Sequence, residues 1–408
     1  MQYGACLKFF TVLAVVACLS ASGGAGAAAP SIQEVLLPDD LSAPNAIIVD
    51  DAGKVWFAEK IGKKIAAYDP EAKTFRSFAV PASWGNVGPS RIAVGPQGKI
   101  WITVQRWADT VDRTNILGEL SPADGSFKKH DLYFKAGAGE LLVDQDRVIP
   151  EDLLVDGKGN VWFLVPGENA LYRYDPADGT LKGYPIPTVD CYPRGIVIDG
   201  KGIIWFGEAN ANKIAGFDPK SATFNEYEIP ALFSGVGELA VDAKGKIWFV
   251  EVRNNRLGVF SPDSERFDEA MLPAARSLPS DLVVDASGKI WFLEYLENKV
   301  GMFDPEQALF KEYVIPTPGS LPGGIAIDVG RSRLWFSESN TEARRLGMLD
   351  IGGTAMAGNN DDSASIKKAA SEKNKSADGG YLNLILAFGM LLAVGAAFVF
   401  ISRRGAGK

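Results

Sequence analysis

Only one histidine, His130, occurs among the 408 residues. A single imidazole excludes any metal site with two histidine ligands and any mechanism that needs two imidazoles. The sequence has three cysteines, and two of them, Cys6 and Cys18, lie at the start of the chain. A chain processed after these residues keeps only Cys191, which excludes an intramolecular disulfide and a cysteine-rich metal site.

Basic residues are fewer than acidic residues, 42 against 50, and the formal net charge is -8. Four basic residues lie near the two ends of the chain, so the remainder carries a net charge of about -12. An acidic body excludes nucleic acid as a partner, because affinity for phosphate backbones comes from Lys and Arg. With 47% hydrophobic and 23% charged residues, the chain is neither disordered nor fibrous.

A pattern of about 43 residues recurs seven times between residues 30 and 350. It consists of an apolar strand, Asp, a glycine turn, a second strand with Trp-Phe, and a third strand ending in Asp-Pro or Ser-Pro. In the fourth repeat it predicts strands at 195–199, 203–208, 214–218 and 224–229. This period predicts an all-β fold, a seven-bladed β-propeller of four-stranded blades. The repeated tryptophans are Trp56, Trp101, Trp162, Trp205, Trp248, Trp291 and Trp335.

The seventh repeat contains three strands and then runs into a polar segment. Residues 32–38 match the pattern of the fourth, outermost strand. We therefore expect them to complete the blade of Trp335 and close the ring, which leaves no open sheet edge. The second repeat is longer than the others because of segments 105–113 and 134–149. Both are expected as lengthened loops on the face of the propeller where the innermost strands begin, which we call the channel face. They indicate either a binding face or neutral loop growth.

The repeats resemble a known family. Segments 245–267 (GKIWFVEVRNNRLGVFSPDSERF) and 288–328 are similar to the repeat of the streptogramin B lyase (virginiamycin B lyase-like) family, and more distantly to gluconolactonase-type propellers. The resemblance covers residues 32–350 and implies the propeller fold. It also implies a lyase that uses two histidines, a glutamate and Mg²⁺ near the channel. This chain cannot supply two histidines, and His130 is predicted at the surface, in the outer strand 127–132.

A glutamate follows the repeated tryptophan by three residues in five repeats, and a Lys or Arg precedes the third strand in the same five. Both are absent together from repeats two and three. This joint occurrence predicts cross-strand ion pairs, each contributing about 0.2–1 kcal/mol. The alternative is a set of carboxylate ligands for Ca²⁺ or Mg²⁺. The predicted pairs are Glu59 with Lys64, Glu208 with Lys213, Glu251 with Arg256, Glu294 with Lys299, and Glu338 with Arg345.

The start of the innermost strand borders the central channel, and its residues differ from repeat to repeat. A purely structural position would be uniform around the ring, so the variation indicates ligand binding at the channel. Alternatively, Arg91 and Arg194 neutralise the acidic residues in a ring of ion pairs. The candidate binding residues are Asn45, Arg91, Glu151, Asp152, Arg194, Glu238 and Asp281. The candidate metal ligands among them are Glu151, Asp152, Glu238 and Asp281.

Both ends of the chain carry membrane signals. Residues 1–29 combine a basic start, an apolar core and small residues, which predicts a signal peptide cleaved near Ala27. Lipidation at Cys18 and an uncleaved anchor are the alternatives. Residues 381–401 contain no charge and are long enough to cross a membrane as a helix, at about 1.5 Å per residue. A sorting signal that is cut and replaced by a lipid is the alternative there.

The basic residues that follow the apolar segment place residues 402–408 in the cytoplasm as a tail. Residues 351–380 are polar and predict a flexible stalk. We therefore expect a monomeric propeller at residues 30–350, outside the cytoplasm and held by one transmembrane helix. It would bind a small molecule, or a surface glycan or protein, at the channel face. The alternative is a lyase or lactonase-type enzyme at the central channel that depends on Ca²⁺ or Mg²⁺.

Overall fold

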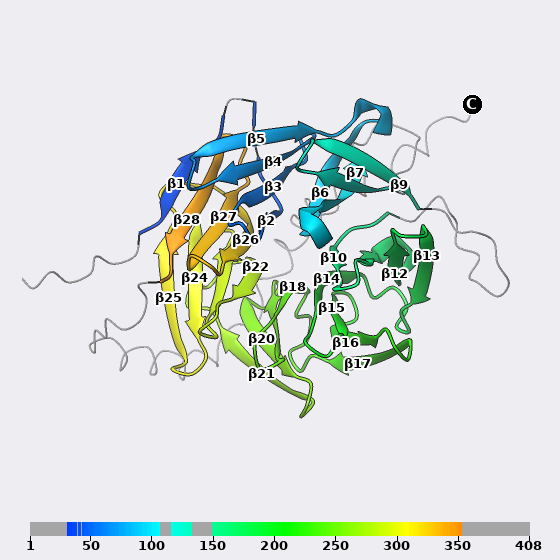
Figure 1. The fold of residues 1–408 in the computed structure, drawn as a ribbon. Helices are drawn as coiled ribbons and strands as arrows, with labels where there is room; N and C mark the ends of the chain where they lie inside the picture. The colour runs from blue at the N-terminus through cyan, green and yellow to red at the C-terminus, as the bar shows by residue number, and fades with distance from the viewer. Residues whose placement is uncertain (1–30, 39, 42, 107–115, 133–148, 353–408) are drawn as a thin grey trace, which may run out of the picture.

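The computed structural model describes residues 31–38, 40–41, 43–106, 116–132 and 149–352. Seven antiparallel sheets of four strands each surround a central axis (Figure 1). The predicted all-β, seven-bladed propeller is confirmed. Each strand predicted in the fourth repeat is present, with ends that differ by no more than two residues.

In each of the first four blades, the strands follow the chain from the innermost to the outermost position. Blade 1 contains β2 (Ile47–Val49), β3 (Val55–Glu59), β4 (Lys64–Asp69) and β5 (Thr74–Ala79). Blade 2 contains β6 (Val87–Val94), β7 (Ile100–Arg106), β8 (Ile116–Ser121) and β9 (Ser126–Asp131). Blade 3 contains β10 (Leu153–Val155), β11 (Val161–Val165), β12 (Ala170–Asp175) and β13 (Thr180–Pro185). Blade 4 contains β14 (Pro193–Ile198), β15 (Ile204–Glu208), β16 (Lys213–Asp218) and β17 (Thr223–Glu228).

Blades 5 and 6 keep the same order, whereas blade 7 combines the two ends of the ring. Blade 5 contains β18 (Val236–Val241), β19 (Ile247–Glu251), β20 (Arg256–Ser261) and β21 (Arg266–Met271). Blade 6 contains β22 (Pro279–Val284), β23 (Ile290–Glu294), β24 (Lys299–Asp304) and β25 (Leu309–Val314). Blade 7 contains β26 (Pro322–Asp328), β27 (Arg333–Glu338), β28 (Arg345–Asp350) and, outermost, β1 (Gln33–Leu36). Short 3-10 helices lie at Ala82–Trp84, Pro96–Gly98 and Pro166–Glu168.

The ring closes as the sequence predicts. Strand β1 lies antiparallel to β28, with Glu34 opposite Gly347 and Leu36 opposite Arg345 (Figure 1). The side chain of Glu34 also accepts hydrogen bonds from the backbone N–H and the hydroxyl of Thr317, at 2.7 and 3.0 Å. The first strand of the propeller is therefore joined both to its own blade and to the loop that enters it.

The repeated Asp and Trp form one structural unit at the turn between the first two strands of a blade. In blade 4, the Asp199 carboxylate accepts the backbone N–H groups of Lys201 and Ile203 and the indole N–H of Trp205. The indole is buried between blades, so its N–H needs a partner there. This requirement explains why Asp and Trp recur six residues apart in blades 1, 3, 4, 5 and 6.

Several expectations fall outside the part of the chain that the structure describes. These are the signal peptide at 1–29, the transmembrane helix at 381–401, the tail at 402–408 and nearly all of the stalk at 351–380. Most of the lengthened loops of blade 2 fall outside it as well. Among the residues that are described, no helix has the length and apolar character needed to cross a membrane.

Candidate functional site: a charged cluster at the propeller axis

Backbone bulges aim the inner strands' charged side chains at the axis. The pairing of β14 with β15 shifts between Arg194 and Ile196, and β6, β18, β22 and β26 show the same irregularity near their starts. Gly195 adopts φ +60 at this point, and a Cβ atom there would lie 2.7 Å from the carbonyl oxygen of Gly237. Close contact between neighbouring inner strands therefore requires glycine at this position.

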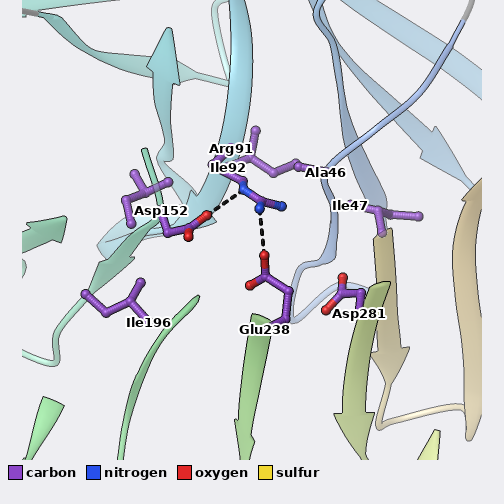
Figure 2. A pocket seen from close by; sticks show the side chains of 9 residues that line it. Ala46, Ile47, Arg91, Ile92, Asp152, Ile196, Glu238 and Asp281 are labelled. Atoms are coloured by element: carbon purple, nitrogen blue, oxygen red, sulfur yellow. Dashed lines mark hydrogen bonds and ion pairs between the residues drawn. The ribbon is translucent and has the colours of Figure 1, made fainter. Parts of the chain in front are cut away.

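Arg91 bridges two acidic side chains from other blades. Its Nε lies 2.6 Å from Asp152 Oδ1, and its Nη2 lies 2.6 Å from Glu238 Oε1. Figure 2 shows the guanidinium pointing between the two carboxylates, with Asp281 beside Glu238. Arg91 lies on β6, Glu238 lies on β18, and Asp152 directly precedes β10. Residues from blades 2, 3 and 5 thus meet at the axis.

A cavity of about 130 Å³ lies at this cluster. Because inner-strand residues of six blades line it, the cavity sits on the propeller axis. It is lined by Ala46, Ile47, Arg91, Ile92, Asp152, Leu153, Ile196, Glu238 and Asp281.

Burial and neighbouring charges set the protonation of the cluster. Asp152 and then Glu238 raise the pKa of Arg91, so the guanidinium stays charged. Burial alone would raise the pKa of Asp152, but Arg91 and Arg194 outweigh it and lower that pKa. Burial, followed by the charge of Glu238, raises the pKa of Asp281 to about 8. Burial and the neighbouring Glu238 charge therefore both favour the protonated form of Asp281.

Three predicted candidates, Glu151, Arg194 and Asn45, are not among the residues that line the cavity. Burial and then Asp152 raise the pKa of Glu151, and Arg194 is the largest opposing charge. The Nε of Arg194 is buried without a hydrogen-bond partner. Asn45, the third, joins blades 1 and 7 through its backbone. Its N–H donates to the Ala58 carbonyl, and its own carbonyl accepts the Ser337 hydroxyl at 2.6 Å.

Two residues at the channel face were not among the predicted candidates. Lys60 Nζ donates to Gln105 Oε1 at 2.6 Å, and burial lowers the pKa of this lysine while the Glu151 charge opposes that shift. Tyr192 has a pKa raised by burial and then by Glu151. Both residues lie in loops outside the strands. The repeat pattern of the sequence does not show which way a loop side chain points, so it gave no reason to select them.

The acidic residues at the axis do not fit a divalent cation. Asp152 and Glu238 each direct an oxygen at Arg91, and Asp152 Oδ2 accepts the N–H of Gly195 at 2.8 Å. The two oxygens of Asp281 accept the N–H groups of Leu282 and Ile325. Within the described ranges, no three His, Cys, Asp or Glu side chains gather as metal ligands would. A Ca²⁺ or Mg²⁺ ion between Asp152 and Glu238 would have to displace the Arg91 guanidinium that bridges them.

The predicted cross-strand ion pairs are wrong in their partners. Each glutamate does lie opposite its expected base in the sheet, as Glu208 lies opposite Lys213. The ion pair of Lys213, however, is with Glu226 of the outermost strand, at 3.0 Å. Arg256, Lys299 and Arg345 likewise bind Glu269, Glu312 and Glu34, whereas Lys64 binds Asp40.

Burial explains this choice of partner. The glutamates of the predicted pairs have no exposed surface: Glu59, Glu208, Glu251, Glu294 and Glu338. A base bonded to one of them would have to be desolvated as well, whereas the outer-strand carboxylates reach solvent. The sequence does contain a pattern that could have identified the outer glutamates as the partners. The outermost strands of repeats 4, 5, 6 and 7 all have Glu at the same position.

His130 is buried, not at the surface as predicted. Its Nδ1 lies 2.9 Å from the Tyr174 hydroxyl, its Nε2 lies 2.9 Å from Glu119 Oε2, and its ring lies against Trp101. Other blades place an aromatic ring against the repeated tryptophan at the same register, for example Tyr184 in blade 3. His130 therefore takes an aromatic core position between blades 2 and 3 and is not among the residues that line the axial cavity.

The fold and the charged axial cluster define a seven-bladed propeller with a central polar cavity. Residues 136–355, more than half of the chain, match the Virginiamycin B lyase family. The chain belongs to this family.

Solved structures of lyases share the fold. Virginiamycin B lyase from Staphylococcus aureus is 23% identical, covers 79% of this chain and 100% of its own, and has a TM-score of 0.67. A streptogramin B lyase is 24% identical over 79% of this chain and 98% of its own, also with a TM-score of 0.67. At these identities the likeness concerns the fold alone.

A curated human relative, NHL repeat-containing protein 3, is 24% identical over 152 residues, which is 36% of this chain. The mouse protein of the same name is 26% identical over 144 residues. The chain spans less than two fifths of the length of each of these two relatives, 39% and 37%.

Proposed function

We propose that this chain is a binding protein that recognises a partner at the channel face and does not catalyse a lyase reaction. The observation that carries the proposal is the Arg91 bridge between Asp152 and Glu238. These three side chains hold one another in place and occupy the position where a catalytic cation would need free carboxylates. The one histidine of the chain lies between blades 2 and 3.

The size of the axial cavity favours a large partner over an enclosed small molecule. Pockets that enclose a small ligand have volumes of about 300–1,000 Å³, whereas this cavity has about 130 Å³. That space accepts one polar group, such as a side chain or part of a sugar. A surface protein or glycan that covers the channel face and inserts one such group fits these dimensions.

The proposed setting is the outer face of a membrane. It is supported by the uncharged segment 381–401, the basic residues after it, and the signal-like segment 1–29. The last described strand, β28, ends at Asp350, and the polar segment predicted as a stalk follows it in the sequence. Membrane fractionation tests this setting, because a chain ending at Gly352 should be soluble whereas the full chain should sediment with membranes.

The lyase alternative is tested with quinupristin, which was captured in a crystal structure of an inactive Staphylococcus aureus virginiamycin B lyase. The full chain is incubated with quinupristin and Mg²⁺, and mass spectrometry follows the compound, with the active Staphylococcus aureus lyase as the positive control. We expect quinupristin to be recovered unchanged. Conversion at a rate proportional to the concentration of this chain would overturn the proposal.

A further inference from the structure

Four glutamates near the channel face, one in each of blades 4 to 7, are fully buried. Glu208, Glu251, Glu294 and Glu338 end the second strands β15, β19, β23 and β27, and none has any exposed surface. Neither oxygen of Glu208 or Glu338 accepts a hydrogen bond from an N–H group, and one oxygen each of Glu251 and Glu294 accepts none. Glu226 and Glu34 lie within hydrogen-bond reach of Glu208 and Glu338, respectively. An ionised carboxylate without donors is costly in such a place, whereas a protonated one is not.

Each sealed glutamate faces a second glutamate and one base. In blade 4, Glu208 meets Glu226 from β17 and Lys213 from β16, with Thr188 and the Cys191 thiol in the preceding loop. The facing groups are Glu269, Arg256 and Asn254 in blade 5, Glu312, Lys299, Glu297 and Ser277 in blade 6, and Glu34 and Arg345 in blade 7. Two neighbouring carboxyl groups bond to each other only when one of them holds a proton.

The outer glutamates hold the loops of the channel face. Glu226 accepts the backbone N–H of Thr188 at 3.0 Å and its hydroxyl at 2.7 Å. Glu269 accepts the N–H of Ala231 at 3.2 Å, and Glu34 binds Thr317 in the same way as Glu226 binds Thr188. These loops enter blades 4, 5 and 7. The loops that enter blades 4 and 5 lead directly into the strands that carry Arg194 and Glu238.

We propose that the glutamate pairs of blades 4, 5 and 7 form a proton-dependent latch on the loops that enter these blades. While the inner glutamate holds a proton, the outer carboxylate keeps its charge and binds the loop and the base. When the inner glutamate loses its proton, two negative charges lie side by side next to one base. The outer carboxylate is then repelled, and the loop that it binds loosens. This inference does not depend on the identity of the partner.

The direction of the pH dependence follows from the inner glutamates. Burial first, and then the outer glutamate, raise the pKa of Glu208 and of Glu338 to about 8, from an ordinary value of 4.5. Burial chiefly raises the pKa of Glu251 and of Glu294 to about 7. The folded state therefore holds protons that the unfolded chain releases between these values. This contribution to stability is fully present below the unfolded pKa of about 4.5, falls steadily as the pH rises from there, and is gone above the folded values of about 7 to 8.

Glu208→Gln tests the latch, because glutamine keeps the shape of the protonated acid and cannot ionise. We measure melting temperatures of the full chain from about pH 4, below the ordinary glutamate pKa of 4.5, to about pH 9. The variant should match the parent at the low end and melt several degrees higher at the high end. The control, Glu228→Gln, changes an exposed glutamate on the same β17 and should show no such trend. A difference between Glu208→Gln and the parent that stays constant with pH would overturn the proposal.

Hydrogen exchange reports the loop itself. After correction for the intrinsic effect of pH, the parent's loop 186–192 should lose about tenfold in protection between neutral and alkaline pH, and Glu208→Gln should keep it. Loop 80–86 enters blade 2, which has Val104 in place of the inner glutamate, and should not respond. Equal behaviour of the two loops would contradict the latch. If Glu208→Gln does not fold, Glu338→Gln and loop 315–321 give the same test in blade 7.

Discussion

Removing residues 32–37 should reduce the stability of the propeller by about 5 kcal/mol or more, a large part of the total stability of a typical domain. The deletion removes β1 and its ladder with β28, and it takes Leu37, which is only 2% exposed, out of the core. It also removes the Glu34 carboxylate that binds Thr317 and Arg345. Blade 7 would then end in an open strand edge, which promotes association between chains.

Urea unfolding followed by tryptophan fluorescence measures this loss, and light scattering measures association. Gln33→Ala is the control, because this exposed side chain contributes little beyond the backbone ladder and should change stability by less than about 0.5 kcal/mol. A deletion variant that unfolds at the parent's urea concentration and stays monomeric would show that β1 does not close the ring.

Replacing Arg91 by methionine should cost about 3–5 kcal/mol, because it leaves two largely buried carboxylates without their shared cation. The side chains of Asp152 and Glu238 are only 7% and 18% exposed, so water cannot take over the role of the guanidinium. In the variant the pKa of both acids should rise. The loss should therefore be larger at neutral pH than at about pH 5, where the acids take up protons.

A triple variant separates the charge effect from a packing effect. Combining Arg91→Met with Asp152→Asn and Glu238→Gln removes the unpaired charges and should recover most of the loss. Arg194→Met is the matched control, because Arg194 also lies near these acids but is not part of the bridge, and it should cost less than Arg91→Met. Equal stability of Arg91→Met and the parent would show that the bridge does not hold the axis together.

The sequence was sufficient to predict the propeller and its closure because both depend on the repeat. Every blade has its buried tryptophan, and in five of the seven blades an Asp six residues earlier binds the indole, as Asp199 binds Trp205, so both recur at a fixed spacing. Residues 32–38 carry the pattern of an outermost strand, and the seventh repeat lacks that strand. These repeated residues are the ones that each blade must bury in order to fold, so they predict the fold but not the function.

The partners of the charged residues could not be predicted in the same way. The joint occurrence of Glu251 and Arg256 is real, and the two lie opposite each other. The sequence does not show that Glu251 is sealed while Glu269 reaches solvent, and this difference in exposure decides which carboxylate Arg256 binds. His130 was misplaced for a related reason, since its position in an outer strand did not reveal that this side of the strand faces blade 3.

At the axis, the sequence left open whether the acids bind a metal ion or neutralise the arginines. Side-chain direction decides this, and it depends on bulges such as the one between Arg194 and Ile196. Asn45 occupies the same place in the repeat pattern, but β2 begins only at Ile47, and Asn45 acts through its backbone. Distances of 2.6 Å from Arg91 to both acids support the ion-pair alternative.

The central claim is that the axis holds an arginine–carboxylate cluster in place of a catalytic cation. A crystal structure of the propeller grown with both Mg²⁺ and Ca²⁺ tests it most directly. We expect Arg91 between Asp152 and Glu238, with no cation within about 2.6 Å of their oxygens. A cation bound to Asp152, Glu238 or Asp281, with the Arg91 side chain turned away from them, would contradict the claim and favour the metal-dependent enzyme.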